Sequence, residues 1–333
     1  MKKTEETNKL QEAIDAIKKK YGDGAVMKSG EIADKIEAIS TNCYAIDNLL
    51  GCGGIPRGRI TEIFGAESSG KSTLCLYLAA QVQKAGGIVV YIDAENAYDQ
   101  QYAETIGVDT SKLLVSQPAS LEESFDSIRE FAESNAVDLI VIDSVSALVP
   151  KSEIEGDEML ANTMAVQARL LSKGLRILSG PISKSKTVVI FINQLRANIG
   201  VMYGAKEITT GGKALKYYAS VRLNIGKGDK ILGAKDAQIG NTMNITAVKN
   251  KVGFPFKKGS VDLYYGQGVD LRMDTLDFGA ECGVISLVGN TYSFEGEKLG
   301  VGRDNAKKVL VKNEEVYQKI RKQINEKISN TKN

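Results

Sequence analysis

The chain has 333 residues, a formal net charge of +2 and no histidine. Without histidine the sequence excludes histidine metal sites, Ser-His-Asp triads and histidine general bases, so any acid–base chemistry falls to carboxylates. No stretch is long and apolar enough to cross a bilayer, and the polar start lacks the apolar region of a signal peptide. The four cysteines form no C-x-x-C pair. We therefore expect a cytoplasmic protein with reduced thiols and no membrane association.

The charge is unevenly distributed along the chain. Residues 206–259 carry eleven Lys or Arg against three Asp or Glu, an excess of eight positive charges, so the remainder sums to −6. A local basic region on a nearly neutral protein indicates a site for a polyanion. Lysine-rich solvated strand edges give the same composition, so the charge pattern leaves both interpretations open.

Taken in chain order, the first predicted element is an N-terminal helix over residues 4–21. It carries one narrow apolar stripe of Leu10, Ala13, Ile14, Ile17 and Tyr21. Such a stripe must pack on something, either the rest of the same chain or a neighbouring subunit.

A phosphate-binding loop follows. Residues 59–64 predict a buried strand and residues 74–83 a helix, and between them the chain matches G-x-x-x-x-G-K-[ST]. In that setting the glycines let backbone N–H groups point at phosphates, Lys71 reaches the β- and γ-phosphates of ATP, and Ser72 completes a Mg²⁺ shell. The alternative is a flexible surface turn, which the flanking strand and helix disfavour. The predicted ATP-binding residues are Gly65, Ala66, Glu67, Ser68, Ser69, Gly70, Lys71, Ser72 and Thr73.

Strands and helices then alternate. Strands are expected at residues 88–92, 113–115, 139–142 and 188–192, and helices at residues 121–134 and 163–178. This alternation predicts an α/β protein with a P-loop ATPase core built on a doubly wound, mostly parallel sheet. Later strands at residues 217–225 and 243–248 are expected as antiparallel additions to that sheet.

Polar residues follow several of these strands. Glu95, Asp143, Asn193 and Gln194 come at or just after strand ends. Ligands of such sheets bind beyond the carboxyl ends of the strands. In a nucleotide hydrolase, Asp143 is placed to hold the Mg²⁺ shell, Glu95 to polarise the attacking water and Gln194 to sense the γ-phosphate. The alternative for each residue is a cap on the following helix.

The end of the chain has a different character. After Gly268, short apolar runs alternate with Gly and polar residues, and Val316, Ile320, Ile324 and Ile328 predict an amphipathic helix. We expect an N-terminal helical segment over residues 1–32, the ATPase core over residues 33–268, and a small C-terminal α/β domain over residues 269–333.

Six segments together resemble the bacterial RecA recombinase family, nearly along the whole chain and in order. They are LGCGGIPRGR at 50–59, GAESSGKS at 65–72, YIDAE at 91–95, DLIVIDS at 138–144, FINQ at 191–194 and TTGGKALKYYASVR at 209–222. The resemblance implies an ATP-dependent, head-to-tail filament on single-stranded DNA that pairs with homologous double-stranded DNA, exchanges strands and promotes self-cleavage of the SOS repressor.

The resemblance also implies roles for individual residues. Glu95 matches the catalytic glutamate, Asp143 the Walker B aspartate and Gln194 the residue that couples ATP to DNA. The remaining matches contact adenine (Asp99 and Tyr102), the ATP of the adjacent subunit (Lys249 and Lys251) or DNA (Arg169, Arg176, Arg196, Ile199, Gly211 and Gly212).

The chain departs from the family in its first DNA loop, residues 153–169, which keeps Glu-Ile-Glu-Gly and Arg169 but lacks the usual Gly-Asp-Ser-His and is one residue longer. The resemblance therefore implies no DNA contacts within residues 159–164. Other readings of the ATP site are a ring helicase, a related repair ATPase and a nucleotide-switched scaffold. The repair ATPase would need a four-cysteine module at its N-terminus, which the sequence lacks, and Glu95 disfavours the scaffold. A transporter ATPase would carry a Leu-Ser-Gly-Gly-Gln signature, which is also missing.

Overall fold

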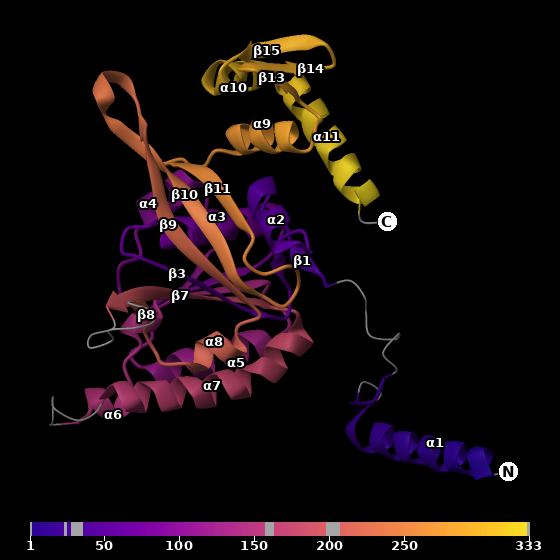
Figure 1. Ribbon diagram of the computed structural model, residues 1–333. Coiled ribbons are helices and arrows are strands. Elements are labelled where there is room, and N and C mark those ends of the chain that lie inside the picture. The colour runs from indigo at the N-terminus through magenta and orange to yellow at the C-terminus, as the bar shows by residue number, and fades with distance from the viewer. Residues whose placement is uncertain (1, 23–24, 28–35, 157–162, 198–206, 332–333) are drawn as a thin grey trace. The chain divides into compact units, whose positions relative to one another are not determined.

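The computed structural model describes residues 2–22, 25–27, 36–156, 163–197 and 207–331 (Figure 1). The chain divides into two compact units, residues 1–37 and residues 38–333. The first unit contains α1 (Lys2–Tyr21), whose Leu10 and Tyr21 are exposed. None of the described helices is long and apolar enough to cross a membrane.

The second unit is built on a ten-stranded sheet of order β12-β11-β10-β9-β3-β7-β6-β4-β5, with β8 paired to β7. Its strands are β3 (Ile60–Gly65), β4 (Val89–Asp93), β5 (Leu114–Ser116), β6 (Leu139–Asp143), β7 (Val188–Ala197), β8 (Glu207–Thr209), β9 (Val221–Leu232), β10 (Gln238–Asn250), β11 (Lys258–Tyr264) and β12 (Gly268–Val269). The six strands from β9 to β5 pair in parallel, and β8, β10, β11 and β12 pair antiparallel. The predicted mostly parallel α/β sheet is confirmed.

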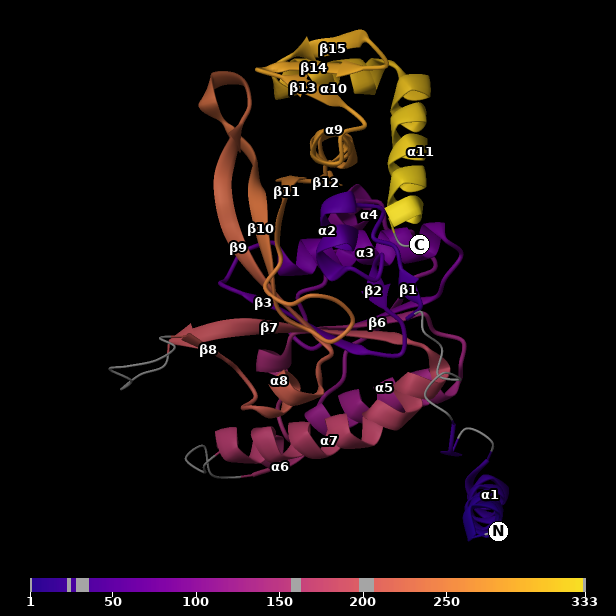
Figure 2. The same ribbon diagram turned by 45° about the vertical axis from the view of Figure 1, so that its right-hand side comes forward.

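Helices cover both faces of this sheet (Figures 1 and 2). Because side chains alternate along a strand, Val89 and Tyr91 of β4 enter one hydrophobic core and Val90 and Ile92 enter the other. The first core lies under α2 (Tyr44–Leu50), α3 (Lys71–Lys84) and α4 (Gln100–Ile106), and the second under α5 (Leu121–Glu133), α7 (Thr163–Ser185) and α8 (Ala214–Tyr218). The short elements are β1 (Ala38–Ile39), β2 (Ile55–Pro56), α6 (Lys151–Ile154), η3 (Val145–Ala147) and η4 (Ala234–Asp236).

Two sequence predictions about these elements were wrong in detail. Tyr217 and Tyr218 end α8 rather than beginning a strand, and β9 starts at Val221 and pairs in parallel with β3. The helix expected over residues 163–178 continues to Ser185, with Pro181 inside it. Ile182 is buried against the sheet, so packing sustains the helix despite the proline.

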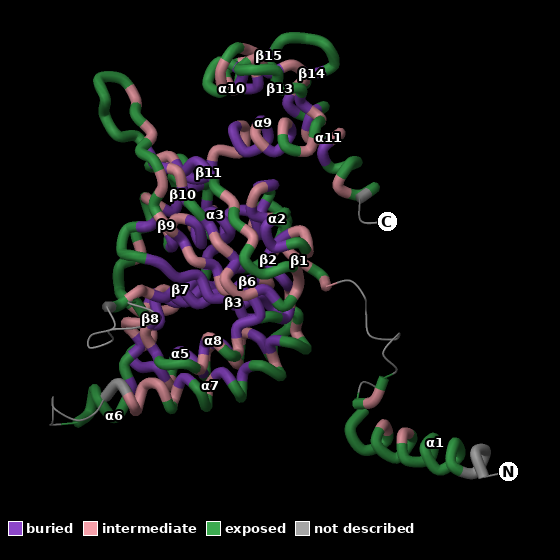
Figure 3. The backbone as a smooth tube through the Cα atoms, in the orientation of Figure 1, coloured by how far each residue is buried: buried purple, intermediate pink, exposed green. Residues whose placement is uncertain are grey.

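The β9–β10 hairpin projects away from the rest of the ten-stranded sheet, and its far end is solvent-exposed (Figures 2 and 3). Lys227, Lys230 and Lys235 are exposed along it. Part of the basic region identified from composition therefore lies on a solvated hairpin.

The C-terminal lobe, residues 271–331, has a hydrophobic core of its own. It contains α9 (Leu271–Glu281), β13 (Ser286–Val288), β14 (Thr291–Phe294), β15 (Glu297–Val301), α10 (Arg303–Lys312) and α11 (Glu314–Thr331). The three strands form an antiparallel sheet. Tyr44 of α2 joins this core and stacks on Phe278, with ring centroids 5.3 Å apart.

Asp274 of α9 links the lobe to the ATPase core by hydrogen bonds to the start of α2. The side chain of Cys43, the N-cap residue of α2, makes no capping hydrogen bond. Instead the buried Asp274 carboxylate accepts hydrogen bonds from the backbone N–H groups of Tyr44, at 2.7 Å, and Ala45, at 2.9 Å. Burial raises the pKa of Asp274, and these hydrogen bonds oppose that shift. A residue 230 positions away thus caps α2.

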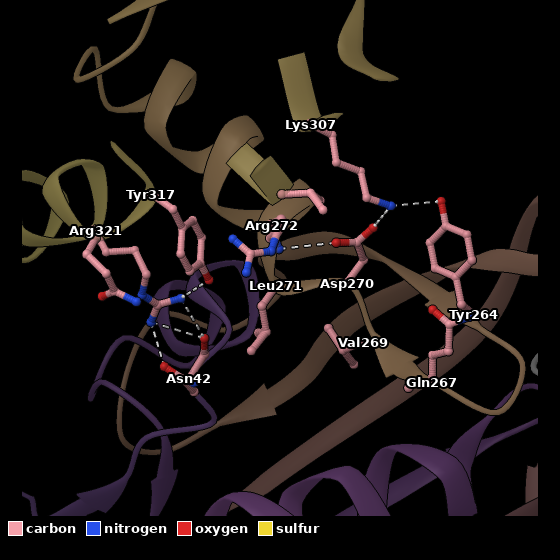
Figure 4. Close-up of a pocket in the computed structure, with 13 residues that line it drawn as sticks. Asn42, Tyr264, Gln267, Val269, Asp270, Leu271, Arg272, Lys307, Tyr317 and Arg321 are labelled. Atoms are coloured by element: carbon pink, nitrogen blue, oxygen red, sulfur yellow. Dashed lines mark hydrogen bonds and ion pairs between the residues drawn. The ribbon is translucent and has the colours of Figure 1, made fainter. Parts of the chain in front are cut away.

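A pocket of about 670 Å³ lies at the same junction (Figure 4). On one side Lys307 pairs with Asp270 and lies 4.5 Å from the centroid of the Tyr264 ring. On the other side Arg321 donates hydrogen bonds to the backbone and side chain of Asn42. These contacts join α10 and α11 to the core.

We expect Asp274→Ala to lower the free energy of unfolding by about 2–4 kcal/mol, because it leaves the buried N–H of Tyr44 and the partly buried N–H of Ala45 without acceptors. Urea denaturation would measure the loss. Glu281→Ala, an exposed position at the end of the same helix, is the matched control and should change stability by less than about 0.5 kcal/mol. Equal effects in the two variants would contradict the capping role.

Candidate functional site

The P-loop adopts the strand–loop–helix arrangement that its sequence predicts. Five residues separate the end of β3 from the start of α3. A side chain at Gly65 is impossible here because its Cβ would lie 2.1 Å from the carbonyl oxygen of Ile225, and Gly70 has a φ of +93°. The Ser69 hydroxyl is buried and makes no hydrogen bond within the described part of the chain. A tight loop at a helix N-terminus with an unsatisfied hydroxyl suits a phosphate group.

Lys71 lies folded over this loop. Its Nζ donates a hydrogen bond to the carbonyl oxygen of Ala66 at 2.7 Å. Burial lowers its pKa, and the negative charges of Asp143, Glu95 and Glu67 act in the opposite direction. A buried ammonium group at the N-terminus of a helix is suited to bind an anion.

Asp143 ends β6 beside the P-loop. Its Oδ2 accepts a hydrogen bond from the Tyr91 hydroxyl at 2.6 Å. Burial raises the pKa of Asp143, and hydrogen bonds from Ser72 and Tyr91 partly offset this. Within the described ranges no group of three His, Cys, Asp or Glu side chains could hold a metal ion by itself. One hydroxyl and one carboxylate fit Mg²⁺, which usually keeps several waters and binds substrate phosphates as well.

Glu95 and Gln194 meet at the same edge of the sheet. Glu95 Oε1 accepts hydrogen bonds from the Ser144 hydroxyl and from Gln194 Nε2, the latter at 3.1 Å. Ser144 in turn bonds the Ser146 hydroxyl at 2.6 Å. In the parallel register Gln194 is the partner of Gly65, so this residue lies beside the first residue of the P-loop. An exposed carboxylate held in this position can accept a proton from a water molecule.

The residues matched to adenine contacts lie close to the P-loop. The hydroxyl groups of Thr73 and Tyr102 are 2.9 Å apart. Asp99 caps α4 by accepting a hydrogen bond from the Tyr102 N–H at 2.9 Å. Asp99 thus has a helix-capping role that the sequence analysis did not consider for it, and the adenine contacts stay predictions.

Lys249 and Lys251 lie near the amino ends of the parallel strands, whereas the P-loop follows the carboxyl end of β3. Asn250 pairs with Val221, and Val221 pairs with Thr61 near the start of β3. Lys249 Nζ donates hydrogen bonds to the carbonyl oxygens of Lys216, at 2.6 Å, and Tyr217, at 2.9 Å. The structure therefore does not bring these lysines to the P-loop of their own chain.

The described residues matched to DNA contacts come from three elements. Arg169 and Arg176 are exposed two turns apart on α7, and Arg196 is exposed on β7 opposite Ile208 of β8. Ile199 lies outside the described residues, as do most of the altered residues of the first DNA loop, 157–162.

Gly211 and Gly212 follow β8 in the chain and lie next to α7. Their φ angles are +83° and +75°. A Cβ at Gly211 would lie 2.6 Å from Leu171 of α7, and one at Gly212 would lie 3.0 Å from Ala168. The glycine pair therefore packs against the helix that carries Arg169.

Sequence reasoning missed the parts played by Tyr91 and Ser144 at this edge of the sheet, and it expected Asn193 there without identifying its partner. Tyr91 lies inside an apolar run and only its hydroxyl reaches Asp143. Ser144 follows Asp143 directly, and that adjacency was the one available signal. Asn193 is fully buried, and its amide bonds Glu62 at 2.9 Å rather than facing the P-loop.

Comparison with known proteins gives the family. Residues 8–270 match the RecA N-terminal domain family, and residues 273–329 match the RecA C-terminal domain family. "Protein RecA" of Chlorobium chlorochromatii is 50% identical over 318 residues, covering 94% of this chain and 89% of the relative. "Protein RecA" of Lactobacillus acidophilus is 47% identical over 325 residues, with 97% and 89% covered.

A third relative matches over almost its whole length. "Protein RecA" of Lactobacillus delbrueckii subsp. bulgaricus is 46% identical over 331 residues, covering 99% of each chain. These matches agree with the P-loop, the strand-end carboxylates and the glycine pair described above. The chain belongs to the RecA family of recombinases.

Proposed function

We propose that this recombinase hydrolyses ATP in a DNA-dependent manner, assembles head to tail on single-stranded DNA, and uses the filament for homologous pairing and strand exchange. One observation carries the proposal. Gln194 bonds the Glu95 carboxylate at 3.1 Å, and its strand continues directly to Arg196 and the paired segment of β8. A nucleotide site and a DNA segment thus share one strand.

Each residue of the ATP site has a distinct part in the proposal. The α3 N-terminus and Lys71 bind the phosphates, and Glu95 orients the attacking water and accepts its proton. Ser72 and Asp143 would hold Mg²⁺, with Tyr91 fixing the carboxylate by its 2.6 Å hydrogen bond. A Mg²⁺ ion held there would supply positive charge that offsets the charge of the bound phosphates.

Head-to-tail assembly has two supports. The P-loop and the Lys249–Lys251 segment lie at opposite edges of one sheet, so a neighbour stacked along that direction can present its lysines to this nucleotide. The α1 helix exposes Leu10 and Tyr21, which a neighbouring subunit can cover. A contact that does not close on itself generates a helical filament.

In this proposal DNA binds to residues that contact its sugar–phosphate backbone. Arg169, Arg176 and Arg196 suit phosphate groups, and the Gly211–Gly212 segment can bring backbone N–H groups close to a strand. Contacts of this kind leave the bases free to pair with a homologous duplex. Self-cleavage of the SOS repressor on such a filament is part of the same proposal and is supported by family membership.

The first test compares ATP hydrolysis with and without single-stranded DNA, and sediments the same mixtures. We expect strong stimulation by DNA together with large, ATP-dependent polymers, because the two sites share a strand. Hydrolysis indifferent to DNA, with only small closed oligomers, would contradict the proposal and favour a motor or a switch.

Glu95→Gln should keep ATP and DNA binding while hydrolysis falls by about 10²–10⁴-fold, since the amide can still accept the bonds from Ser144 and Gln194 but cannot take a proton. Turnover assays and nucleotide binding would be measured in parallel. Glu130→Gln, an exposed carboxylate on α5, is the control and should leave turnover unchanged. Normal turnover in Glu95→Gln would remove the catalytic role.

Lys71→Ala should weaken ATP binding by about 10- to 150-fold, the equivalent of about 1.5–3 kcal/mol for a hydrogen bond to a charged group. ATP-dependent assembly should be lost with it. Fluorescence of a labelled nucleotide and sedimentation would report the two effects. Lys84→Ala, at the other end of α3, serves as the control. Unaltered nucleotide affinity in Lys71→Ala would contradict the assignment.

A further inference from the structure

Glu62 is a fully buried carboxylate in the middle of the sheet. Its strand, β3, lies between β7 and β9, and its Cα partners are Phe191 and Arg222. Burial of a charge is costly unless the charge is paired and hydrogen-bonded. Glu62 meets both requirements, since Oε2 pairs with Arg222 and Oε1 accepts a hydrogen bond from Asn193 at 2.9 Å.

Asn193 carries the connection from Glu62 towards the DNA segment. Its Nδ2 also donates to the carbonyl oxygen of Thr210 at 3.0 Å, and its Oδ1 accepts from the backbone N–H of Gln194 at 2.9 Å. One side chain therefore fixes both the backbone of Gln194 and the residue before Gly211. Both polar atoms of the Asn193 amide are used, which leaves little freedom for it to reorient.

Arg222 carries the connection in the other direction. Its guanidinium lies 4.6 Å from the centroid of the Phe64 ring, a cation–π contact with the residue that precedes the P-loop. The side chain of Arg222 is only 14% exposed, so the contact is largely shielded from water. The start of the P-loop and the base of the DNA segment are thereby linked to the same carboxylate.

The segment that follows Thr210, Gly211–Gly212, lies close against α7. A Cβ at Gly211 would lie 2.6 Å from Leu171 and 3.2 Å from Val145, and one at Gly212 would lie 3.0 Å from Ala168, the neighbour of Arg169, so neither position has room for a side chain. A displacement of Thr210 would therefore disturb the packing of α7 as well as the position of β7. Close-packed interiors transmit such strain rather than absorb it.

We propose that Glu62 is a positioning residue that couples the DNA segment to the nucleotide site by holding Asn193 and Arg222. This inference rests on the proposed function, because it presumes that ATP and single-stranded DNA bind to the same chain. Glu62 itself touches neither ligand and acts through Gln194, Thr210 and Phe64. It adds a second, buried link beside the direct contact between Gln194 and Glu95.

Glu62→Gln tests the proposal with minimal change of shape. The amide oxygen can still accept from Asn193, but the –NH₂ group faces the guanidinium of Arg222, donor against donor. The quantity to measure is the factor by which a non-hydrolysable ATP analogue tightens binding of a fluorescent oligothymidine. We expect that factor to fall by roughly 5- to 150-fold, the range typical of coupling between two sites.

A second variant separates positioning from stability. Glu62→Gln leaves the Arg222 charge buried and unpaired, whereas Glu62→Gln with Arg222→Met removes both charges and should recover the thermal unfolding temperature. Under the proposal the coupling factor stays low in the double variant. If stability and coupling recover together, Glu62 has only a structural role and the proposal is overturned.

The control is Asp138→Asn, which breaks a carboxylate–arginine pair with Arg57, at 2.9 Å, near the opposite edge of the sheet. It should leave the coupling factor as in the unsubstituted protein. If the unsubstituted protein shows no coupling, the proposed function fails and takes this inference with it. If it does show coupling and Glu62→Gln keeps the full factor, only the positioning role fails.

Discussion

The parallel pairing of β3 with β7 and β9 is the constraint on which the rest of the structure depends. All six residues of β3 are buried, and its register sets Gly65 beside Gln194 on one side and Ile225 on the other. The P-loop and the strand that leads to Arg196 therefore leave the sheet at the same edge. The antiparallel return of β10 carries Lys249 to the opposite edge. The P-loop and Lys249 therefore lie at opposite ends of the parallel strands.

The interior of this sheet is not uniformly apolar. Glu62 and Asn193 are fully buried in it, and Arg222, whose side chain is 14% exposed, pairs with Glu62. Such groups are tolerated because every carboxylate oxygen has a partner, and a set of mutually bonded polar groups permits few alternative arrangements. In our proposal, the hydrogen bonds and the ion pair that satisfy the buried charge of Glu62 also hold the predicted nucleotide and DNA segments in a fixed relation.

The C-terminal lobe follows a related principle. Asp274 supplies the cap that the N-terminal end of α2 lacks, and Tyr44 of that helix completes the core of the lobe. The C-terminal lobe therefore provides an acceptor for unpaired N–H groups of α2, and α2 provides an aromatic ring that is buried in the core of the lobe. The two pack as one compact unit although their families are matched as separate domains.

The sequence by itself determined the elements whose signals are local. Glycines at fixed spacing, Lys71 and the apolar runs before Asp143 and Gln194 predicted the P-loop, the parallel sheet and the edge that carries the polar residues. Only the tertiary structure decided which polar residues meet. Ser144 with Glu95, Tyr91 with Asp143, Asn193 with Glu62 and Asp274 with α2 join positions from 49 to 230 residues apart. Periodicity and propensity describe a segment and its own neighbours, whereas these pairings depend on strand order and register, which long-range packing sets.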